Sequence, residues 1–148
     1  MKPISSLKVF VYGTLKPGEA NYSRYCDGHV ISQQDAYIRG TLYDLPFGYP
    51  AMIKGNNKAK GILLTFKDPS IISDLDRLEG YQSQRDANLN EYYRNLVCVY
   101  SLDDRLLDRA WAYFMTLKQV QKYGGVLVKS NWWTGEKTRN KGIKKYSL

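Results

Sequence analysis

The run LKVFVYGTL, residues 7–15, combines β-branched and aromatic residues and is interrupted at Gly13. Such residues favour a β-strand, and glycine allows the chain to turn sharply after it. Further strand-like runs lie at residues 36–45, 61–66, 92–100, 106–115 and 126–128. The polar stretch at residues 101–105 indicates a hairpin connection between two of them. We therefore expect strands to dominate the fold.

The clearest helical signal follows the third strand. Asp68 suits the N-cap position and Pro69 the first helical position. Apolar residues then recur at helical spacing at Ile71, Ile72, Leu75 and Leu78, and Gly80 supplies the stop. A second, weaker helix is expected from Glu19 or Asn21 to Tyr25. Several strands with one or two helices predict an α+β domain with a curled or barrel-like sheet.

The composition predicts one soluble domain spanning residues 1–148. The chain has 148 residues, of which 43% are hydrophobic, and it contains no repeat or linker that would separate domains. With two cysteines and one histidine, a zinc site of the usual kind is disfavoured, and we expect no metal. No run approaches the ~20 apolar residues of a membrane-spanning helix. Met1–Ser6 is too short and too polar for a signal peptide, so we expect a cytoplasmic protein.

The net charge of +8 is concentrated at the C-terminal end. Before Lys118 there are 14 Lys and Arg against 13 Asp and Glu, and residues 118–148 hold 8 against 1. We interpret residues 118–148 as a basic C-terminal extension whose lysines and arginines are solvated. Nucleic-acid binding is a less favoured alternative, in which Trp132 and Trp133 stack on bases beside Lys137 and Arg139. The tryptophans are more simply explained by packing onto the barrel.

Glu79 stands out because it falls on the apolar face of the predicted helix. On a helical wheel it lies about 80° from Ile71, inside the arc of the apolar residues. Burial and the carbonyl end of the helix should both raise the pKa of its carboxyl group. A carboxyl group of that kind can exchange protons near neutral pH. An alternative is an ordinary ion pair with Arg77, Arg85 or Arg94.

Tyr12, Gly13, Thr14 and Leu15 form the turn after the first strand. Successive amide groups in such a turn can converge on a carboxylate or an oxyanion. The simpler alternative is a turn with no ligand. Most of the 13 tyrosines are expected in the core, with one or two lining a site.

Four segments occur in the order seen in gamma-glutamylcyclotransferase-like proteins, and the chain resembles that family over about residues 9–113. They are VFVYGTLKPG (9–18), YDLPFGYPAM (43–52), LDRLEG (75–80) and YYR (92–94). The family also includes gamma-glutamylamine cyclotransferases and plant avirulence-induced-gene proteins. The resemblance implies a small mixed β-barrel flanked by one or two helices.

The same resemblance implies a function. Glu79 would be the general acid/base, the Tyr12–Leu15 turn would hold the glutamyl part of the substrate, and Tyr113 would line the pocket. The reaction would cyclise the glutamyl part of a gamma-glutamyl amide or peptide to 5-oxoproline without a cofactor. The small-molecule substrate stays open among glutathione, gamma-glutamyl amino acids, gamma-glutamyl-lysine and an acyl-chain compound. A non-catalytic member that binds a small ligand in the same pocket is the other alternative.

Overall fold

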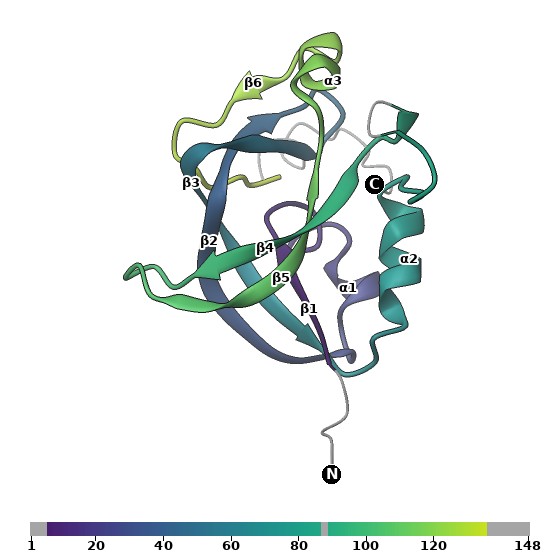
Figure 1. Ribbon diagram of the computed structural model, residues 1–148, viewed down its shortest axis with the longest axis vertical. Coiled ribbons are helices and arrows are strands. Elements are labelled where there is room, and N and C mark those ends of the chain that lie inside the picture. Colours follow the sequence, from purple (N-terminus) through teal and green to yellow (C-terminus); the bar gives the residue numbers. More distant parts are fainter. Residues whose placement is uncertain (1–5, 87–88, 136–148) are drawn as a thin grey trace.

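A mixed sheet of six strands forms the centre of the computed structural model, which describes residues 6–86 and 89–135 (Figure 1). The strands are β1 (Leu7–Val11), β2 (Val30–Asp44), β3 (Pro50–Phe66), β4 (Tyr93–Tyr100), β5 (Leu106–Phe114) and β6 (Val126–Leu127). In the same part of the chain there are three short helices, α1 (Tyr22–Tyr25), α2 (Ile71–Leu78) and α3 (Leu117–Lys122). Figure 1 shows α1 and α2 on the same flank of the sheet, whereas α3 lies at one end of the molecule.

The strands close into a small, irregular barrel because β3 has two partners. β1 runs antiparallel to β3 and parallel to β5, and β5 pairs antiparallel with β4. The order along the sheet is β3-β1-β5-β4-β2-β6, and a long antiparallel pairing of β2 with β3 closes the ring. The expected α+β class with a small mixed β-barrel is therefore confirmed.

β1 lies between two hydrophobic clusters, as its two-residue periodicity dictates. Leu7, Val9 and Val11 face a cluster that includes Leu75 and Leu78 of α2. Phe10 and Tyr12 face the other cluster, to which β2, β3, β4 and β5 all contribute. The second cluster fills the barrel, and the first fills the space between the barrel and α2. An apolar residue is therefore needed at most positions of β1.

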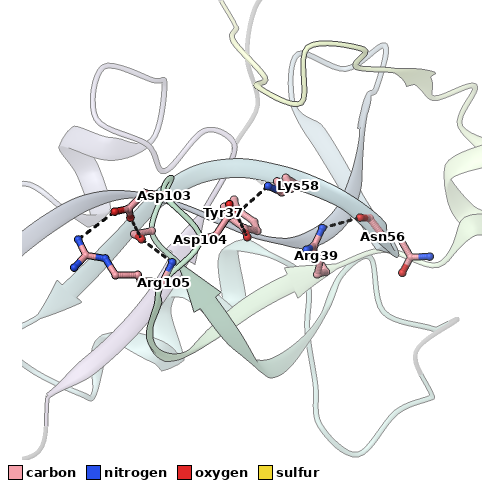
Figure 2. A network of polar contacts seen from close by, with 8 residues as sticks. Tyr37, Arg39, Asn56, Lys58, Asp103, Asp104 and Arg105 are labelled. Carbon is pink, nitrogen blue, oxygen red and sulfur yellow. Dashed lines mark hydrogen bonds and ion pairs between the residues drawn. The ribbon is translucent and has the colours of Figure 1, made fainter.

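β2 and β4, which are neighbours in the barrel, are held together mainly by contacts at the turn between β4 and β5. Within the described residues, β2 and β4 pair at one position, Tyr37 with Tyr100, whose ring centroids lie 5.4 Å apart. At the turn, the Asp104 carboxylate accepts a hydrogen bond from the Tyr37 hydroxyl at 2.6 Å (Figure 2). It also pairs with the Lys58 ammonium group at 2.8 Å. These contacts fasten the hairpin tip to β2 and β3.

The predicted strands are all present, but β3 is much longer than the pattern indicated. Only residues 61–66 were predicted to be a strand, whereas β3 begins at Pro50. Its first half contains Gly55, Asn56 and Asn57, residue types that disfavour strands. They coincide with a register shift opposite β2, and the pairing on both sides of that shift overrides their local preference.

The helix predictions need two corrections. Asp68 is not the N-cap and Pro69 is not the first helical residue, because α2 begins at Ile71 with Ser70 at the N-cap. The Asp68 carboxylate instead accepts a hydrogen bond from the Ser70 amide at 2.9 Å, in the turn before the helix. Gly80 ends α2 as predicted, with a positive φ of 65°. α1 was predicted, but α3 was not, so the described residues hold three helices rather than one or two.

α3 had a recognisable signal in the sequence. Thr116 is its N-cap, and its side-chain oxygen accepts a hydrogen bond from the Gln119 amide at 3.2 Å. The helix is short and buries only Val120, so its apolar periodicity is weak. None of the helices in the described part of the chain has the length and apolar character needed to cross a membrane.

The first part of the basic C-terminal segment belongs to the barrel. β6 pairs with the end of β2, and Trp133 is 2% exposed within the barrel cluster. The Trp133 indole N–H donates a hydrogen bond to the Asp44 carboxylate at 2.7 Å. Trp133 thus packs onto the barrel. The cluster formed by Lys137, Arg139, Lys141, Lys144 and Lys145 lies outside the described residues.

Replacing Trp133 with Ala should reduce the unfolding free energy by about 3–5 kcal/mol, because it empties a large part of the barrel cluster. It also removes the donor to Asp44. Urea unfolding followed by circular dichroism measures the loss. Val126→Ala on β6 is the control, since Val126 is 66% exposed and its truncation should cost at most about 0.5 kcal/mol. Equal costs for the two variants would show that Trp133 is not part of the core.

Candidate active site

One hollow collects all six residues that the sequence singled out. It is lined by Phe10, Val11, Tyr12, Gly13, Thr14, Leu15, Tyr49, Pro50, Glu79, Tyr92 and Tyr113. Residues 12–15 follow β1, Glu79 follows α2, and Tyr113 lies near the end of β5. We call this space the Glu79 hollow.

The backbone on both sides of Glu79 fixes where its side chain points. Its amide donates to the Leu75 carbonyl at 2.9 Å, which completes the last turn of the helix. Its carbonyl accepts from the Tyr92 amide at 3.2 Å, and the next carbonyl, of Gly80, accepts from the Glu91 amide at 3.3 Å. The helix end is thereby held against the segment that leads into β4. Glu79 is 8% exposed.

The surroundings of Glu79 favour the protonated carboxyl group. Burial is the largest cause and raises its pKa to about 8, and the nearby carboxylates of Glu91 and Asp76 act in the same direction. Among the described residues, none donates a hydrogen bond to the Glu79 carboxyl group. The direction of this pKa shift agrees with the expectation from the helical wheel.

The alternative in which an arginine neutralises Glu79 is wrong. Arg94 makes a bidentate contact with Asp76, at 2.8 and 3.1 Å. Arg85 donates to the Asn90 side chain and to the Gly80 carbonyl. Arg77 pairs with Asp74 on the exposed side of α2. Each of these three arginines is thus engaged elsewhere.

Tyr113 is held at both ends, so its ring is a fixed wall of the hollow. Its hydroxyl donates to Asp76 at 2.7 Å, and Asp76 is itself held by Arg94. Its backbone carbonyl accepts from the Tyr12 hydroxyl at 2.7 Å. Burial raises the pKa of both phenols far above the usual value, so both stay protonated. The hydroxyl groups of Tyr12 and Tyr113 fix the orientation of the two rings and are poorly suited to accept protons.

The turn after β1 approaches Pro50 very closely. The Lys16 amide closes this turn by donating to the Gly13 carbonyl at 3.1 Å. A Cβ atom at position 13 would lie 2.7 Å from Pro50 Cγ and 2.9 Å from Cδ, so only glycine fits without displacement. The Asn21 amide and side chain hold the Thr14 carbonyl and hydroxyl, at 2.8 and 2.9 Å. The close approach to Pro50 explains why the turn needs glycine.

Sequence reasoning missed several residues around the hollow. Tyr92 donates from its hydroxyl to the Pro50 carbonyl at 2.6 Å, and Tyr49 donates to the Glu91 carboxylate at 2.8 Å. Tyr49 and Pro50 lie between two of the predicted strands, and Glu91 lies just before another. The sequence offered one indication that Pro50 and Tyr92 belong to the site, because they lie in two of the segments that resemble the family, 43–52 and 92–94. Nothing local in the sequence shows that Glu91 faces Glu79.

The side chains that line the hollow include the carboxyl group of Glu79 and four phenols, and they do not form a metal ligand set. Within residues 6–86 and 89–135, no three His, Cys, Asp or Glu side chains converge so as to hold a metal ion. Burial raises the pKa of the Cys26 thiol to about 12, which makes it a poor nucleophile. Glu79 lines the hollow with a pKa of about 8, a value at which a carboxyl group can exchange protons near neutral pH.

Comparison with known proteins gives a consistent result. The sequence model of the family described as "Gamma-glutamyl cyclotransferase, AIG2-like" matches residues 9–135. A Vibrio cholerae protein named "Putative gamma-glutamylcyclotransferase" is 34% identical over 71 residues, which is 48% of this chain. The matched part spans 60% of that relative's length.

Two solved structures show the same fold. An AIG2-like protein from Mus musculus superposes with a TM-score of 0.70 at 18% identity, covering 97% of each chain. YkqA from Bacillus subtilis superposes with a TM-score of 0.61 at 21% identity, covering 93% of this chain and 43% of that one. At these identities the likeness extends to the fold alone.

The raised pKa of Glu79 should make the stability of the protein depend on pH. Its folded-state pKa of about 8 lies above the ~4.3 of an unfolded glutamate, so the folded state binds the proton more tightly. This contribution is complete below about pH 4 and is lost as the pH rises through 8. Relative to Glu79→Gln, which cannot titrate, wild type should lose about 3–5 kcal/mol of unfolding free energy between about pH 5 and pH 9.

Urea unfolding of both proteins at three pH values measures this difference. Asp74→Asn is the matched control, because Asp74 lies on the exposed side of the same helix and should leave the pH dependence unchanged. Parallel pH curves for wild type and Glu79→Gln would mean that the carboxyl group is not buried in solution.

Proposed function

Since this chain belongs to the gamma-glutamyl cyclotransferase, AIG2-like family, we propose that it cyclises gamma-glutamyl amides or peptides. The glutamyl part would become 5-oxoproline, and the amine would be released. The observation that carries this proposal is the buried carboxyl group of Glu79, with a pKa of about 8, in the hollow beside the turn after β1.

The substrate supplies its own nucleophile in this reaction. The α-amine of the glutamyl part attacks the γ-carbonyl carbon, a five-membered ring closes, and the bond to the leaving nitrogen breaks. A serine–histidine or cysteine–histidine pair is not needed. The protein must hold the glutamyl chain bent. A well-oriented attack within one molecule can replace roughly 7–11 kcal/mol of the barrier.

Glu79 would carry the proton between the two nitrogens. The substrate's α-ammonium group favours the ionised carboxylate when it enters the hollow, and it can then give up a proton to it. After ring closure, the protonated Glu79 donates to the leaving nitrogen. The second proton lost from the ring nitrogen leaves with the amine, which is released as an ammonium ion at neutral pH. A carboxyl group with a pKa near the working pH suits both steps.

The turn after β1 is the proposed anchor for the negative groups of the substrate. Among the described residues, neither the Gly13 amide nor the Leu15 amide donates a hydrogen bond to another backbone group. Two such amides beside the hollow can bind the α-carboxylate or the oxyanion that forms at the γ-carbonyl. The rings of Tyr49, Tyr92 and Tyr113 enclose the remaining sides and keep water from the reacting atoms.

Glu79→Gln should abolish the release of 5-oxoproline while the fold is retained. The amide cannot accept and return a proton, so turnover should fall by about 10²–10⁴-fold. Chromatographic detection of 5-oxoproline, with glutathione, a gamma-glutamyl amino acid and gamma-glutamyl-lysine as substrates, measures the effect. Asp74→Asn on the same helix should keep wild-type turnover. Near-wild-type turnover by folded Glu79→Gln would falsify the assignment.

Gly13→Ala should weaken substrate binding more than it slows the chemical step. The added Cβ must displace either the turn or the rigid Pro50 ring, so we expect KM to rise about 10-fold or more, equivalent to about 1.4 kcal/mol. Steady-state kinetics separates KM from kcat. Val126→Ala, at an exposed position of β6 that does not line the hollow, is the control and should leave KM unchanged. An unchanged KM in folded Gly13→Ala would remove the turn from the binding site.

A further inference from the structure

Lys16 is a buried cation for which the proposed reaction has no use. It follows the turn at residues 12–15 directly and is 1% exposed. Of the lysines in the described part of the chain, it alone is buried. Burial lowers the pKa of its ammonium group to about 8, although Glu19 acts in the opposite direction. A charge held in such a place requires compensating contacts.

Two tryptophans of the C-terminal segment supply those contacts. The Lys16 ammonium group donates a hydrogen bond to the Trp133 carbonyl. It also lies 3.4 Å from the centroid of the Trp132 ring, within the range of a cation–π interaction. Trp132 itself is 41% exposed, so its ring lies between the Lys16 ammonium group and solvent.

The segment that provides these contacts is anchored independently. Trp133 is buried in the barrel cluster and bonded to Asp44. Farther along, the Gly135 amide donates to the Glu19 carboxylate at 3.2 Å, and the Thr134 hydroxyl donates to it at 3.4 Å. Figure 1 shows the chain beyond β6 returning toward the loop that follows β1. We call Trp132–Gly135 the C-terminal strap.

The C-terminal strap contacts the loop after β1 at Lys16 and at Glu19, and one turn of backbone lies between these two residues. The Lys16 amide bonds to the Gly13 carbonyl at 3.1 Å, and the Glu19 amide bonds to the Lys16 carbonyl at 3.0 Å. Lys16 and Glu19 are therefore rigidly connected to each other and to Gly13. Side chains at both positions reach the strap. The strap thus limits where the Gly13–Leu15 turn can lie.

We propose that Lys16 is a positioning residue, which uses the C-terminal strap to hold the Gly13–Leu15 turn in its substrate-binding form. This inference rests on the proposed function in one respect, because it takes the turn to be the substrate anchor. It assigns a role to residues 132–135 within the basic segment 118–148. Substrate affinity should then depend on residues that line no part of the Glu79 hollow.

The chemistry of the contact explains why a lysine is required. A methionine would fill similar space but would leave the Trp133 carbonyl without its donor and the Trp132 ring without a cation. A leucine at position 132 would remove the ring and leave the lysine exposed to water. A phenylalanine there keeps an aromatic face and should preserve much of the interaction.

The test combines hydrogen exchange with kinetics in Trp132→Leu, Trp132→Phe and Lys16→Met. In Trp132→Leu and Lys16→Met we expect exchange to accelerate about 10-fold at the amides of residues 16, 19 and 21, which donate to the Gly13, Lys16 and Thr14 carbonyls, since the turn opens more often. We expect KM to rise about 10-fold, with kcat changed less than about threefold. In Trp132→Phe, the amide exchange rates and KM should both stay close to their wild-type values. Lys54→Met, which removes an exposed lysine near the Tyr93 ring, is the control and should change neither.

The outcomes distinguish this inference from the proposed function. Unchanged exchange at the amides of residues 16, 19 and 21 in Trp132→Leu would overturn it, as would faster exchange with an unchanged KM. Trp132 is half-exposed, so this variant should fold even if Lys16→Met does not. If wild type releases no 5-oxoproline from any substrate, the proposed function fails. The exchange rates then still decide whether the strap holds the turn.

Discussion

The Glu79 carboxyl group is confined at the end of α2, where burial disfavours its charge and Arg77, Arg85 and Arg94 are engaged elsewhere. Gly80 ends the helix, and backbone bonds from Glu91 and Tyr92 fix the direction of the side chain. The acidic neighbours Glu91 and Asp76 add to the effect of burial. An ionised carboxylate in this place is costly until a cation arrives. A substrate with an α-ammonium group supplies that cation, which links the fold directly to the proposed chemistry.

The tyrosine hydroxyl groups around the Glu79 hollow donate hydrogen bonds within the protein, and these bonds keep the hollow rigid. The Tyr12 hydroxyl donates to the Tyr113 carbonyl, the Tyr113 hydroxyl donates to Asp76, and the Tyr92 hydroxyl donates to the Pro50 carbonyl. Because these hydroxyls are occupied, the phenol rings act as fixed walls. In the proposed reaction, proton transfer is then left to the carboxyl group of Glu79. The proposed role of the C-terminal strap extends the same principle to the turn after β1.

The local parts of the fold and of the site could be predicted from the sequence. β1, α2 and the misplaced carboxylate of Glu79 follow from periodicity, because side chains two or about 3.6 residues apart share a face. The first half of β3 could not be predicted, since pairing overrides its weak local preference. The α3 helix was missed because its apolar periodicity is weak, although Thr116 marks its start. The clamp of Asp76 and Arg94 on Tyr113, and the burial of Trp133, join residues that are far apart in the chain. No pattern within a short window contains that information.

The ionisation of Glu79 in the wild-type protein tests this account most directly. A carbon-13 NMR titration of labelled glutamate carboxyl groups, with the Glu79 signal identified by its loss in Glu79→Gln, reports this pKa without any substrate. We expect the Glu79 signal to titrate with a midpoint of about 8. A midpoint near the ~4.3 of a solvated glutamate would contradict it, because the carboxyl group would then be exposed and unsuited to its proposed task.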